Sequence, residues 1–518
     1  MKRFLTLFIV ICMVFILSAC NNNSKSNNGD QVTGNVKDTM NIALTQDRGT
    51  LDPSYMMGYD LMNAMRMVYE PLWDIDKDGN RIWVLATNLD MVEPTIWHIT
   101  LRKEVTFANG NPFNADDVLF SLWRANNRVG EPQNFPVLNL DKTKALDDYT
   151  VEVVFDSYDL AYTYTFPLAY MYDKESFDDD KVSIESNGTG PYSVKEYVVN
   201  SHLDLTARDD YWGDKPAIKN LHFIIISEDS QRVTALQTGT VDMAGVPYQD
   251  IEFIQTLENL TVDLGPASQG LSVALYFNPS ESSVFYNNPD ARKAVALAID
   301  KQAIVDVAYS GFAETSRLPV SIYNSDVENR YMDLGIYGIG YNVELAREYA
   351  ERSGLVGKDV LLIDNGSSDR QVVAELIQTN LKEIGVNVSV WNLDPGSWLS
   401  VVFDDTQFDM AVDMTVAPSM TLGQNYYSWI NFHIGGSYTR NPWPGNNRAM
   451  ELANIVMSIS DPNQLSEIYM ELTELQIEAM LWYNLADLQR ATAFSSSLSG
   501  YMPMLAGHVN YANLTWIS

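Results

Sequence analysis

The chain has 518 residues, of which 46% are hydrophobic, so it is long enough to bury the cores of more than one domain. Its 67 acidic residues outnumber its 34 basic residues and give a formal net charge of -33. This balance excludes the basic surface that nucleic-acid binding requires. The acidic surface either steers a cationic ligand inward or only keeps the protein soluble, and the composition leaves both interpretations open.

The N-terminal region reads as a targeting segment followed by a tether. Two basic residues precede an apolar run over residues 4–17, which is shorter than the about 20 residues of a membrane-spanning helix and is typical of a signal peptide. The run ends in Leu-Ser-Ala before Cys20, which resembles the lipobox of bacterial lipoproteins; an ordinary cleavage site after small residues is the alternative. We therefore expect a signal peptide over residues 1–19, a lipid anchor to the membrane at Cys20, and a flexible tether over residues 20–37.

The two cysteines of the chain, Cys12 and Cys20, both lie in this N-terminal region. The body of the protein therefore has no cysteine for a disulfide or for nucleophilic catalysis. Its stability must come from hydrophobic cores of adequate size.

The most informative stretch of the chain is residues 97–122. Apolar and polar residues alternate on either side of residues 102–104, from Trp97 to Leu101 and from Val105 to Phe107, which is the period of half-buried strands. Asn109-Gly110 then supplies a tight turn. Asn114 stands where a helix N-cap is expected, and two aspartates follow in a first turn that favours negative charge. The pattern predicts strands, a turn and a capped helix.

Similar patterns recur along the rest of the chain. Strands are expected over residues 40–45, 150–155, 221–226, 273–278, 360–363 and 386–390. Helices are expected after the caps Asn288 and Asp300, and over residues 60–69, 231–238, 341–354, 371–384 and 465–481. The alternation of helices and strands predicts an α/β protein.

The stretch at 97–122 resembles a segment of the family 5 solute-binding proteins, the dipeptide- and oligopeptide-binding receptors of bacterial ABC importers. The positions that carry the resemblance are Trp97, Leu101, Arg102, Val105, Phe107, Gly110, Pro112, Phe113, Ala115, Asp117, Val118, Phe120 and Ser121. Shorter family-like motifs follow at Leu51-Asp52-Pro53, Gly188 to Tyr192 (G-T-G-P-Y), Phe408-Asp409-Met410 and Ser499-Gly500-Tyr501. We expect the G-T-G-P-Y motif to need glycines that permit a turn ahead of a strand.

This resemblance implies a two-lobe periplasmic-binding-protein type II-like fold of α/β class with an additional inserted subdomain. Lobe 1 is expected over residues 38–75, 184–268 and 489–518, the inserted subdomain over residues 76–183, and lobe 2 over residues 269–488. The implied function is the capture of peptides by hinge closure of the lobes, at the extracellular face of the cell membrane, and their delivery to an ABC permease. A monomer without a cofactor or metal is expected.

The resemblance also implies where the ligand lies. The chain of many relatives passes close to the ligand after the Leu-Asp-Pro corner, and here Tyr55, Met57 and Tyr59 occupy that passage. Oligopeptide receptors can carry an acidic residue near the position of Met57, and this chain has an apolar and aromatic lining instead. Tyr276 and Asn278, at the end of the expected strand 273–278, complete this part of the expected site.

A second group of expected ligand contacts lies in lobe 2. Asp413 is the acid nearest to the place where peptide-binding relatives hold a free amino group, and a solvated loop acid is the alternative. Trp429 and Trp443 lie in aromatic segments that we expect to be loops. Such aromatic residues either stack on a ligand or belong to a core.

Two other functions remain open from the sequence. An oligosaccharide-binding receptor of the same family is suggested by the missing acid near Met57 and by the aromatic segments. An exported lipoprotein hydrolase is disfavoured because the chain has no G-x-S-x-G, H-E-x-x-H or P-loop motif, although its acidic residues leave a carboxylate pair open. A metal cluster is disfavoured because the five histidines are scattered singly, at His98, His202, His222, His433 and His508.

Overall fold

The structure of the protein is a computed structural model. It describes residues 37–55, 60–127, 138–156, 158, 162–265, 271–324, 326–404, 407–416, 421–433, 447–459, 461–504 and 508–517. Four predicted site residues, Cys20, Met57, Tyr59 and Trp443, lie outside these residues, as do the expected signal peptide and almost all of the tether.

The first sheet has seven strands drawn from distant parts of the chain. Their order is β12(Leu260–Asp263), β19(Thr492–Ser495), β11(Met243–Gly245), β1(Thr39–Leu44), β10(Asn220–Ile225), β9(His202–Ala207) and β8(Tyr192–Val198). Strand β1 is parallel to β10 and β11, whereas β8, β9 and β10 are joined as antiparallel neighbours. Helices α4(Asp229–Gln237) and α5(Ile251–Gln255) belong to the same part of the chain. The strands predicted over 40–45 and 221–226 are confirmed.

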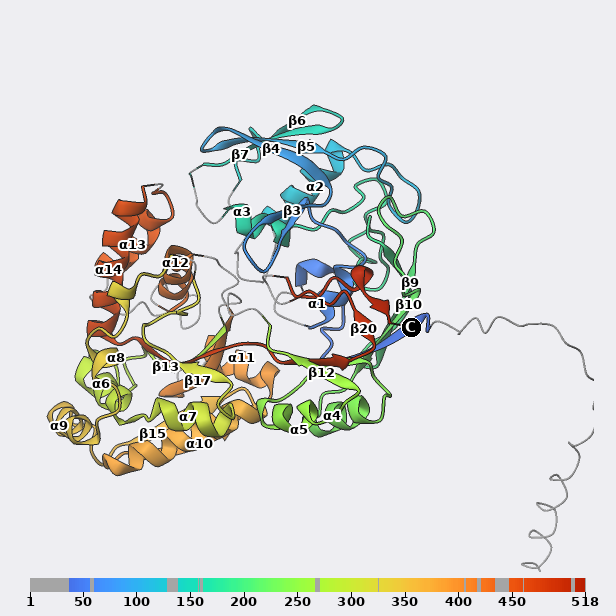
Figure 1. The fold of residues 1–518 in the computed structure, drawn as a ribbon. Helices are drawn as coiled ribbons and strands as arrows, with labels where there is room; N and C mark the ends of the chain where they lie inside the picture. Colours follow the sequence, from blue (N-terminus) through green and yellow to red (C-terminus); the bar gives the residue numbers. More distant parts are fainter. Residues whose placement is uncertain are drawn as a thin grey trace, which may run out of the picture. The chain divides into compact units, whose positions relative to one another are not determined.

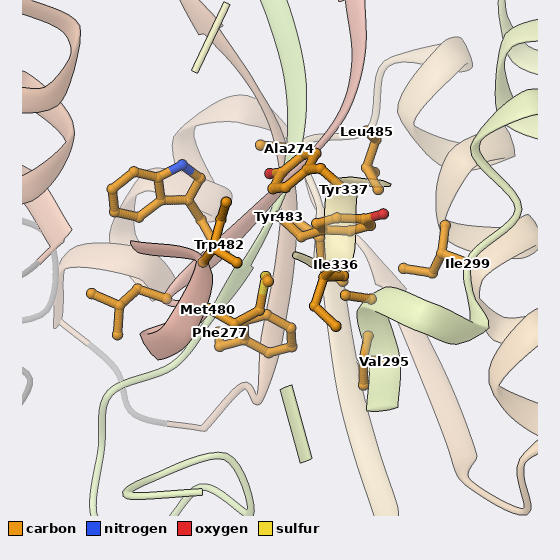
Figure 2. Packing of buried hydrophobic residues seen from close by; sticks show 14 of the residues in the cluster. Ala274, Phe277, Val295, Ile299, Ile336, Tyr337, Met480, Trp482, Tyr483 and Leu485 are labelled. Atoms are coloured by element: carbon orange, nitrogen blue, oxygen red, sulfur yellow. The ribbon is translucent and has the colours of Figure 1, made fainter. Parts of the chain in front are cut away.

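The second sheet has six strands. Their order is β14(Ala313–Thr315), β18(Trp482–Leu488), β13(Leu271–Phe277), β17(Met410–Val416), β15(Asp359–Asp364) and β16(Asn387–Asn392). The helices of this part are α6(Pro289–Ala298), α7(Lys301–Ala308), α8(Ile336–Ile339), α9(Val343–Ser353), α10(Ser368–Glu383), α11(Pro395–Asp404), α12(Leu422–His433), α13(Asn447–Val456) and α14(Pro462–Ala479). Side chains of β13, α6, α8 and β18 pack together in its core (Figure 2). The α/β class predicted from the sequence is confirmed.

The helix caps predicted in the second half of the chain are confirmed. The side chain of Asn288 accepts from the backbone N–H of Ala291 at the start of α6. The side chain of Asp300 accepts from the N–H of Ala303 at the start of α7. Each cap satisfies a backbone donor that the first turn of a helix leaves free, so the residue type alone marks the boundary.

The described strands change from one sheet to the other at two places in the chain. The first lies between β12 and β13, and the second lies between β18 and β19. The two crossing segments contact each other, because the Gln489 side-chain amide donates to the Gly265 carbonyl oxygen at 3.0 Å. When only a small number of segments connect two such parts, the parts can rotate against one another.

A smaller third sheet contains the stretch that is most informative in the sequence. Its strand order is β4(Ala86–Glu93), β5(Ile96–Leu101), β7(Thr150–Val154) and β6(Lys144–Asp147), and helix α2(Ala115–Asn126) packs against it (Figure 1). The predicted N-cap of α2 is confirmed, because the Asn114 side chain accepts from Asp116 N–H at 2.8 Å. The Asp117 carboxylate also accepts from Asn114 N–H at 2.9 Å, which completes a capping box.

The expected strand through Val105 and Phe107 is wrong. Glu104 has a φ of +63°, which interrupts an extended chain. The segment then folds back on itself, because the N–H of Phe113 donates to Val105 O at 3.0 Å. Both apolar side chains are still buried. The alternation therefore predicted their burial correctly and their secondary structure incorrectly.

Removing the Asn114 cap tests this local account. We expect Asn114→Ala to lower the free energy of unfolding of this part of the protein by about 1 kcal/mol, since a backbone donor of α2 loses its partner. The measurement is the denaturant midpoint followed by circular dichroism, with Asn88→Ala on the exposed face of β4 as control. A cap variant no less stable than the Asn88 variant would contradict the assignment.

The G-T-G-P-Y motif packs its backbone directly against the chain that follows helix α1(Asp60–Met65). Gly190 N–H donates to Val68 O at 2.9 Å, and Tyr192 N–H donates to Met67 O at 3.0 Å. A Cβ atom on Gly188 would lie 2.0 Å from Val68 O, and one on Gly190 would lie 2.4 Å from Met67 O. Neither glycine is among the residues with positive φ. The expected reason for the glycines is therefore wrong: they permit close backbone contact, not an unusual turn.

Candidate ligand-binding site

The candidate site lies where the parallel pairing of two strands in the second sheet ends, at the carboxyl end of β15 and in the middle of β17. Strands β15 and β17 pair in parallel, with Asp364 opposite Val412. The residues that come next, Asn365 and Asp413, therefore lie at the same edge of the sheet. Helix α10 begins a few residues later, at Ser368. Ligands in open α/β sheets bind outside the carboxyl ends of the strands, which makes this edge the natural place for a site.

Asp413 is held at this edge by two hydrogen bonds to one of its oxygens. Its Oδ1 accepts from the Asn365 side-chain amide at 3.1 Å and from the N–H of Met414 at 2.7 Å. The residue lies on β17 and is partly buried, so it is not a loop acid. Burial raises the pKa of Asp413 to about 6, against the lowering effect of the nearby Arg370. The raised pKa shows that burial destabilises the ionised carboxylate, and a cation that binds it would stabilise that form and lower the pKa.

Arg370 is the positive group of the site, and it is buried at the start of α10. Its Nη1 donates to Asp369 Oδ1 at 2.9 Å and to Ser367 Oγ at 2.8 Å. Its Nε and the Oδ2 of the neighbouring Asp364 are buried without a hydrogen-bond partner among the described residues. Buried polar atoms are nearly always paired, so the unpaired Nε of Arg370 favours a ligand or water beside it.

Segments of the first sheet's part of the chain reach this edge. The Ser368 hydroxyl donates to Asp229 Oδ2 at 2.7 Å, which joins the starts of α10 and α4. The Tyr248 hydroxyl donates to Gln489 O at 2.8 Å, and its ring meets Tyr309 edge-on with centroids 5.1 Å apart. Burial and the charge of Asp369 raise the pKa of Tyr248, so it stays a neutral donor. The site thus lies where the parts that carry the two sheets contact each other.

Tyr276 shares a sheet face with Asp413. It is opposite Ala411 across the antiparallel β13–β17 pair, and Asp413 is opposite Ala274. Directly opposite residues and residues two apart on a strand point to the same face. The Tyr276 side chain is partly buried and packs against the cluster that contains Trp398 and Ala411. Its position next to Asp413 is consistent with the predicted contact, which remains a prediction.

Asn278 and Tyr55 are two other predicted contacts. Asn278 is buried beside Asp409, just before the start of β17 and about 13 Å along the strand from Asp413. Its side-chain amide donates to Phe408 O at 2.6 Å, and its oxygen accepts from Ser280 N–H at 2.9 Å. Tyr55 is 41% exposed at the end of the short helix η1(Pro53–Tyr55). The predicted ligand contact of Tyr55 remains a prediction.

The segment around Trp429 is a helix and not the expected loop. Residues 422–433 form α12, and the side chain of Trp429 is outside what the structure describes. Its neighbour Tyr426 is fully buried, with its hydroxyl 2.6 Å from Thr473 Oγ1. The aromatic residues of this segment follow helical spacing, which the sequence reading overlooked.

The sequence reading also missed the residues around Asp413. The run from Asp364 to Arg370 is polar, and it stands between a strand and a helix that were both predicted. The rule that ligands bind at carboxyl ends of strands could have selected it. The pairing with Asp413 could not have been found, because it depends on a contact across 48 residues.

A separate pocket of about 510 Å³ is formed by residues of the segments 108–109 and 172–187, by Tyr69 and by Ser193 of strand β8. It is lined by Tyr172, Phe177 and Lys181 and by the group of polar side chains around Asp173. Asp173 Oδ2 accepts from the amide groups of Asn109 at 2.7 Å and Asn187 at 2.9 Å. These polar groups satisfy each other, so the pocket lacks the unpaired atoms found at the carboxyl edge.

The described part of the chain contains no helix that is both long and apolar enough to cross a membrane.

Comparison with known proteins identifies the family. Residues 84–436 match the model of the bacterial extracellular solute-binding proteins, family 5. The chain belongs to this family. The resemblance inferred from the sequence is therefore confirmed, and it covers the third sheet, the G-T-G-P-Y motif and most of the second sheet.

Relatives of this family 5 protein are binding proteins for several small solutes. The glutathione-binding protein GsiB of Salmonella choleraesuis is 23% identical over 486 residues, which is 89% of this chain and 91% of GsiB. The nickel-binding periplasmic protein of Escherichia coli is 26% identical over 383 residues, which is 68% of this chain and 71% of that protein. Their names describe binding proteins, which fits a protein that performs no chemistry.

Solved structures with the same fold cover nearly the whole chain. The oligopeptide-binding protein AppA of Bacillus subtilis, in complex with a nonapeptide, has a TM-score of 0.81 at 19% identity and covers 93% of this chain and 99% of AppA. DppA of Helicobacter pylori, in complex with the peptide STSA, has a TM-score of 0.79 at 20% identity with the same coverage. The family 5 protein thus has the periplasmic-binding-protein type II-like fold that was predicted.

Proposed function

We propose that this protein is the lipid-anchored, extracellular receptor of an ABC importer and that it captures peptides between two lobes. In this proposal lobe 1 carries the first sheet and consists of residues 38–75, 184–268 and 489–518. Lobe 2 carries the second sheet and consists of residues 269–488. The inserted subdomain over residues 76–183 carries the third sheet.

The observation that carries the proposal is the polar edge around Asp413. A peptide offers an ammonium group, a carboxylate and a series of backbone donors and acceptors. Asp413 and Asp369 supply two carboxylates there and Arg370 supplies one guanidinium, so the group as a whole favours a cation. We infer that the free amino group of the peptide binds Asp413 and that the unpaired Nε of Arg370 is completed when ligand or ordered water fills the edge.

The way in which the chain is connected supports closure of the lobes. The two crossing segments, near Gly265 and Gln489, would act as the hinge. The hydrogen bond between Ser368 and Asp229 joins a helix start from each lobe beside the proposed site. A ligand held at the carboxyl edge would then be shielded from water by lobe 1, which strengthens its polar contacts.

The anchor and the permease complete the proposal. The signal-peptide pattern and Cys20 support export and lipid attachment, and two or more acyl chains suffice for durable membrane binding. The protein would present the closed form, as a monomer, to the permease in the same membrane. The saccharide alternative rested in part on loop aromatics, and the segment that contains Trp429 is a helix.

Peptide binding by protein that starts at Asp38 tests the proposal. We expect peptides with a free amino group to raise the melting temperature, and we expect the same peptides with an acetylated amino group to bind at least about tenfold more weakly in calorimetry. Stabilisation by oligosaccharides and by none of the peptides would contradict it. Turnover of chromogenic peptides or glycosides would favour the hydrolase instead.

A further inference from the structure

Two of the five histidines lie side by side on the first sheet, although they are twenty positions apart in the sequence. His202 is on β9, and His222 is on the neighbouring strand β10. Their ring centroids are 5.6 Å apart. The expectation that the histidines are scattered singly is therefore wrong for this pair. Antiparallel pairing between β9 and β10 brings them together, which the spacing in the sequence does not reveal.

Two carboxylates share this place with the histidines. Glu196 on β8 is directly opposite Asp204 on β9, and Asp204 is directly opposite His222 on β10. Cross-strand neighbours of this kind point to one face of the sheet. The His202 Nε2 is 4.0 Å from Glu196 Oε2, and the His222 Nδ1 contacts Asp204 Oδ1. One ligand atom each of Glu196, His202 and Asp204 lies within 4.8 Å of the others.

We propose that Glu196, His202 and Asp204 form a binding site for a divalent transition-metal ion such as Zn²⁺ or Ni²⁺. Imidazole nitrogen together with carboxylate oxygen is a ligand set that suits these ions, and three protein ligands plus water complete a tetrahedral zinc shell. Two carboxylates balance the charge of the ion. This site is outside the proposed peptide site, and it does not depend on the proposed transport function.

The surroundings of the cluster favour an ion over simple ion pairs. The Ser201 hydroxyl is 3.0 Å from His202 Nδ1, which orients the ring and leaves Nε2 directed at Glu196. The Glu196 side chain is 58% exposed, so it is free to move the short distance to the about 3.4 Å that separates ligand atoms around a tetrahedral zinc ion. No lysine or arginine forms an ion pair with Glu196 or Asp204 among the described residues.

His98 provides a contrast within the same chain. Its Nε2 is 2.9 Å from Glu152 Oε2 on the third sheet, but Lys144 Nζ lies 3.2 Å from the other oxygen of Glu152. The contact there joins one histidine to one acid, and a lysine competes for that acid. The pair is a matched control for a histidine–carboxylate contact, and we expect it not to bind metal.

Calorimetry with ZnCl₂ and NiCl₂, added separately to tag-free protein without any chelating amino acid, tests the proposal. We expect one equivalent of either ion to bind to the wild-type protein and to the His98→Gln variant. We expect His202→Gln and Glu196→Gln each to bind at least about tenfold more weakly. Glu196 is exposed, so its variant is expected to fold, and an unchanged circular dichroism spectrum confirms this for both.

Metal binding that is unchanged in His202→Gln and Glu196→Gln would overturn the proposal, as would a wild-type protein that takes up no stoichiometric metal. Peptide affinity provides the independent readout. We expect it to be unchanged in both variants, so a failure of the metal site is distinguishable from a failure of the peptide receptor.

Discussion

Replacing Asp413 with asparagine is expected to weaken the binding of a peptide with a free amino group by about 30-fold or more, which corresponds to about 2 kcal/mol. Asparagine keeps the shape of the side chain and the acceptor for the amide of Asn365, which lies 3.1 Å from the carboxylate. It removes only the charge that would pair with the ammonium group. Calorimetry with the same peptide in both proteins measures the loss.

The affinity of the wild-type protein should also depend on pH. The pKa of Asp413 is raised to about 6 by burial, so the free protein holds a proton there in more acidic solution. A peptide ammonium, with an ordinary pKa of about 7.7–8.0, stays charged between pH 5 and pH 7 and binds the ionised carboxylate. Affinity should therefore be nearly full at pH 7, fall as the pH passes through about 6, and be about tenfold lower at pH 5 than at pH 7. The Asp413→Asn variant should lose this dependence.

Asp359 gives a matched control for that experiment. It lies at the amino end of β15, on the edge opposite Asp413, and it is exposed while accepting from the Asn387 side-chain amide at 3.0 Å. We expect Asp359→Asn to bind peptide with the wild-type affinity and the wild-type pH profile. Equal affinities of the Asp413 and Asp359 variants would remove the ammonium role from Asp413.

Replacing Gly188 with alanine is expected to cost more than about 3 kcal/mol of stability or to prevent folding. The added Cβ would lie 2.0 Å from Val68 O. That oxygen accepts the hydrogen bond from Gly190 N–H, so it cannot retreat without breaking the contact that holds the two segments together. The cost therefore combines a steric clash with the loss of a buried hydrogen bond.

Gly245→Ala is the control for this prediction. Gly245 lies on β11 with an ordinary φ, and the nearest atom to an added Cβ is Ala491 O at 4.0 Å. We expect its denaturant midpoint to stay close to that of the wild-type protein, and that of Gly188→Ala to fall far below both. A Gly188 variant as stable as the Gly245 variant would show that close backbone packing does not explain the glycines of the motif.

Much of the fold follows from signals that are local in the sequence. The caps Asn114, Asn288 and Asp300 each mark a helix start because the cap and its backbone donor lie within three residues. Strands that are buried on one face alternate apolar and polar residues, and strands that are buried on both faces are continuously apolar. The error at Val105 and Phe107 arose because alternation reports burial and does not exclude a turn.

The family motifs predict the fold, but they do not show which contacts between distant residues stabilise it. Glu70 and the pair Tyr211-Trp212 are 141 and 142 positions apart, yet the Tyr211 hydroxyl donates to Glu70 Oε1 at 2.7 Å and the Trp212 indole N–H donates to Oε2 at 3.0 Å. Burial raises the pKa of Glu70 to about 7, against the effect of these donors. Such partners become visible only when the chain is folded, because no periodicity links them.

The candidate site was predictable only in part for the same reason. Asp413 could be selected from the sequence as an acid near the expected position, but Arg370 and Asn365 reach it from another strand end and a helix start. The metal ligands Glu196, His202 and Asp204 come together through strand register. A shift of one residue would turn each side chain to the other face, so the sequence alone does not fix them as a group.

Native mass spectrometry of the protein, produced from Asp38 onward and purified without denaturation, is the most direct test of peptide capture. We expect the protein to carry peptides from the cell, which are released on activation in the gas phase as a set of peptide masses. Masses separated by hexose units, or an empty protein that afterwards responds to sugars and to no peptide, would contradict it.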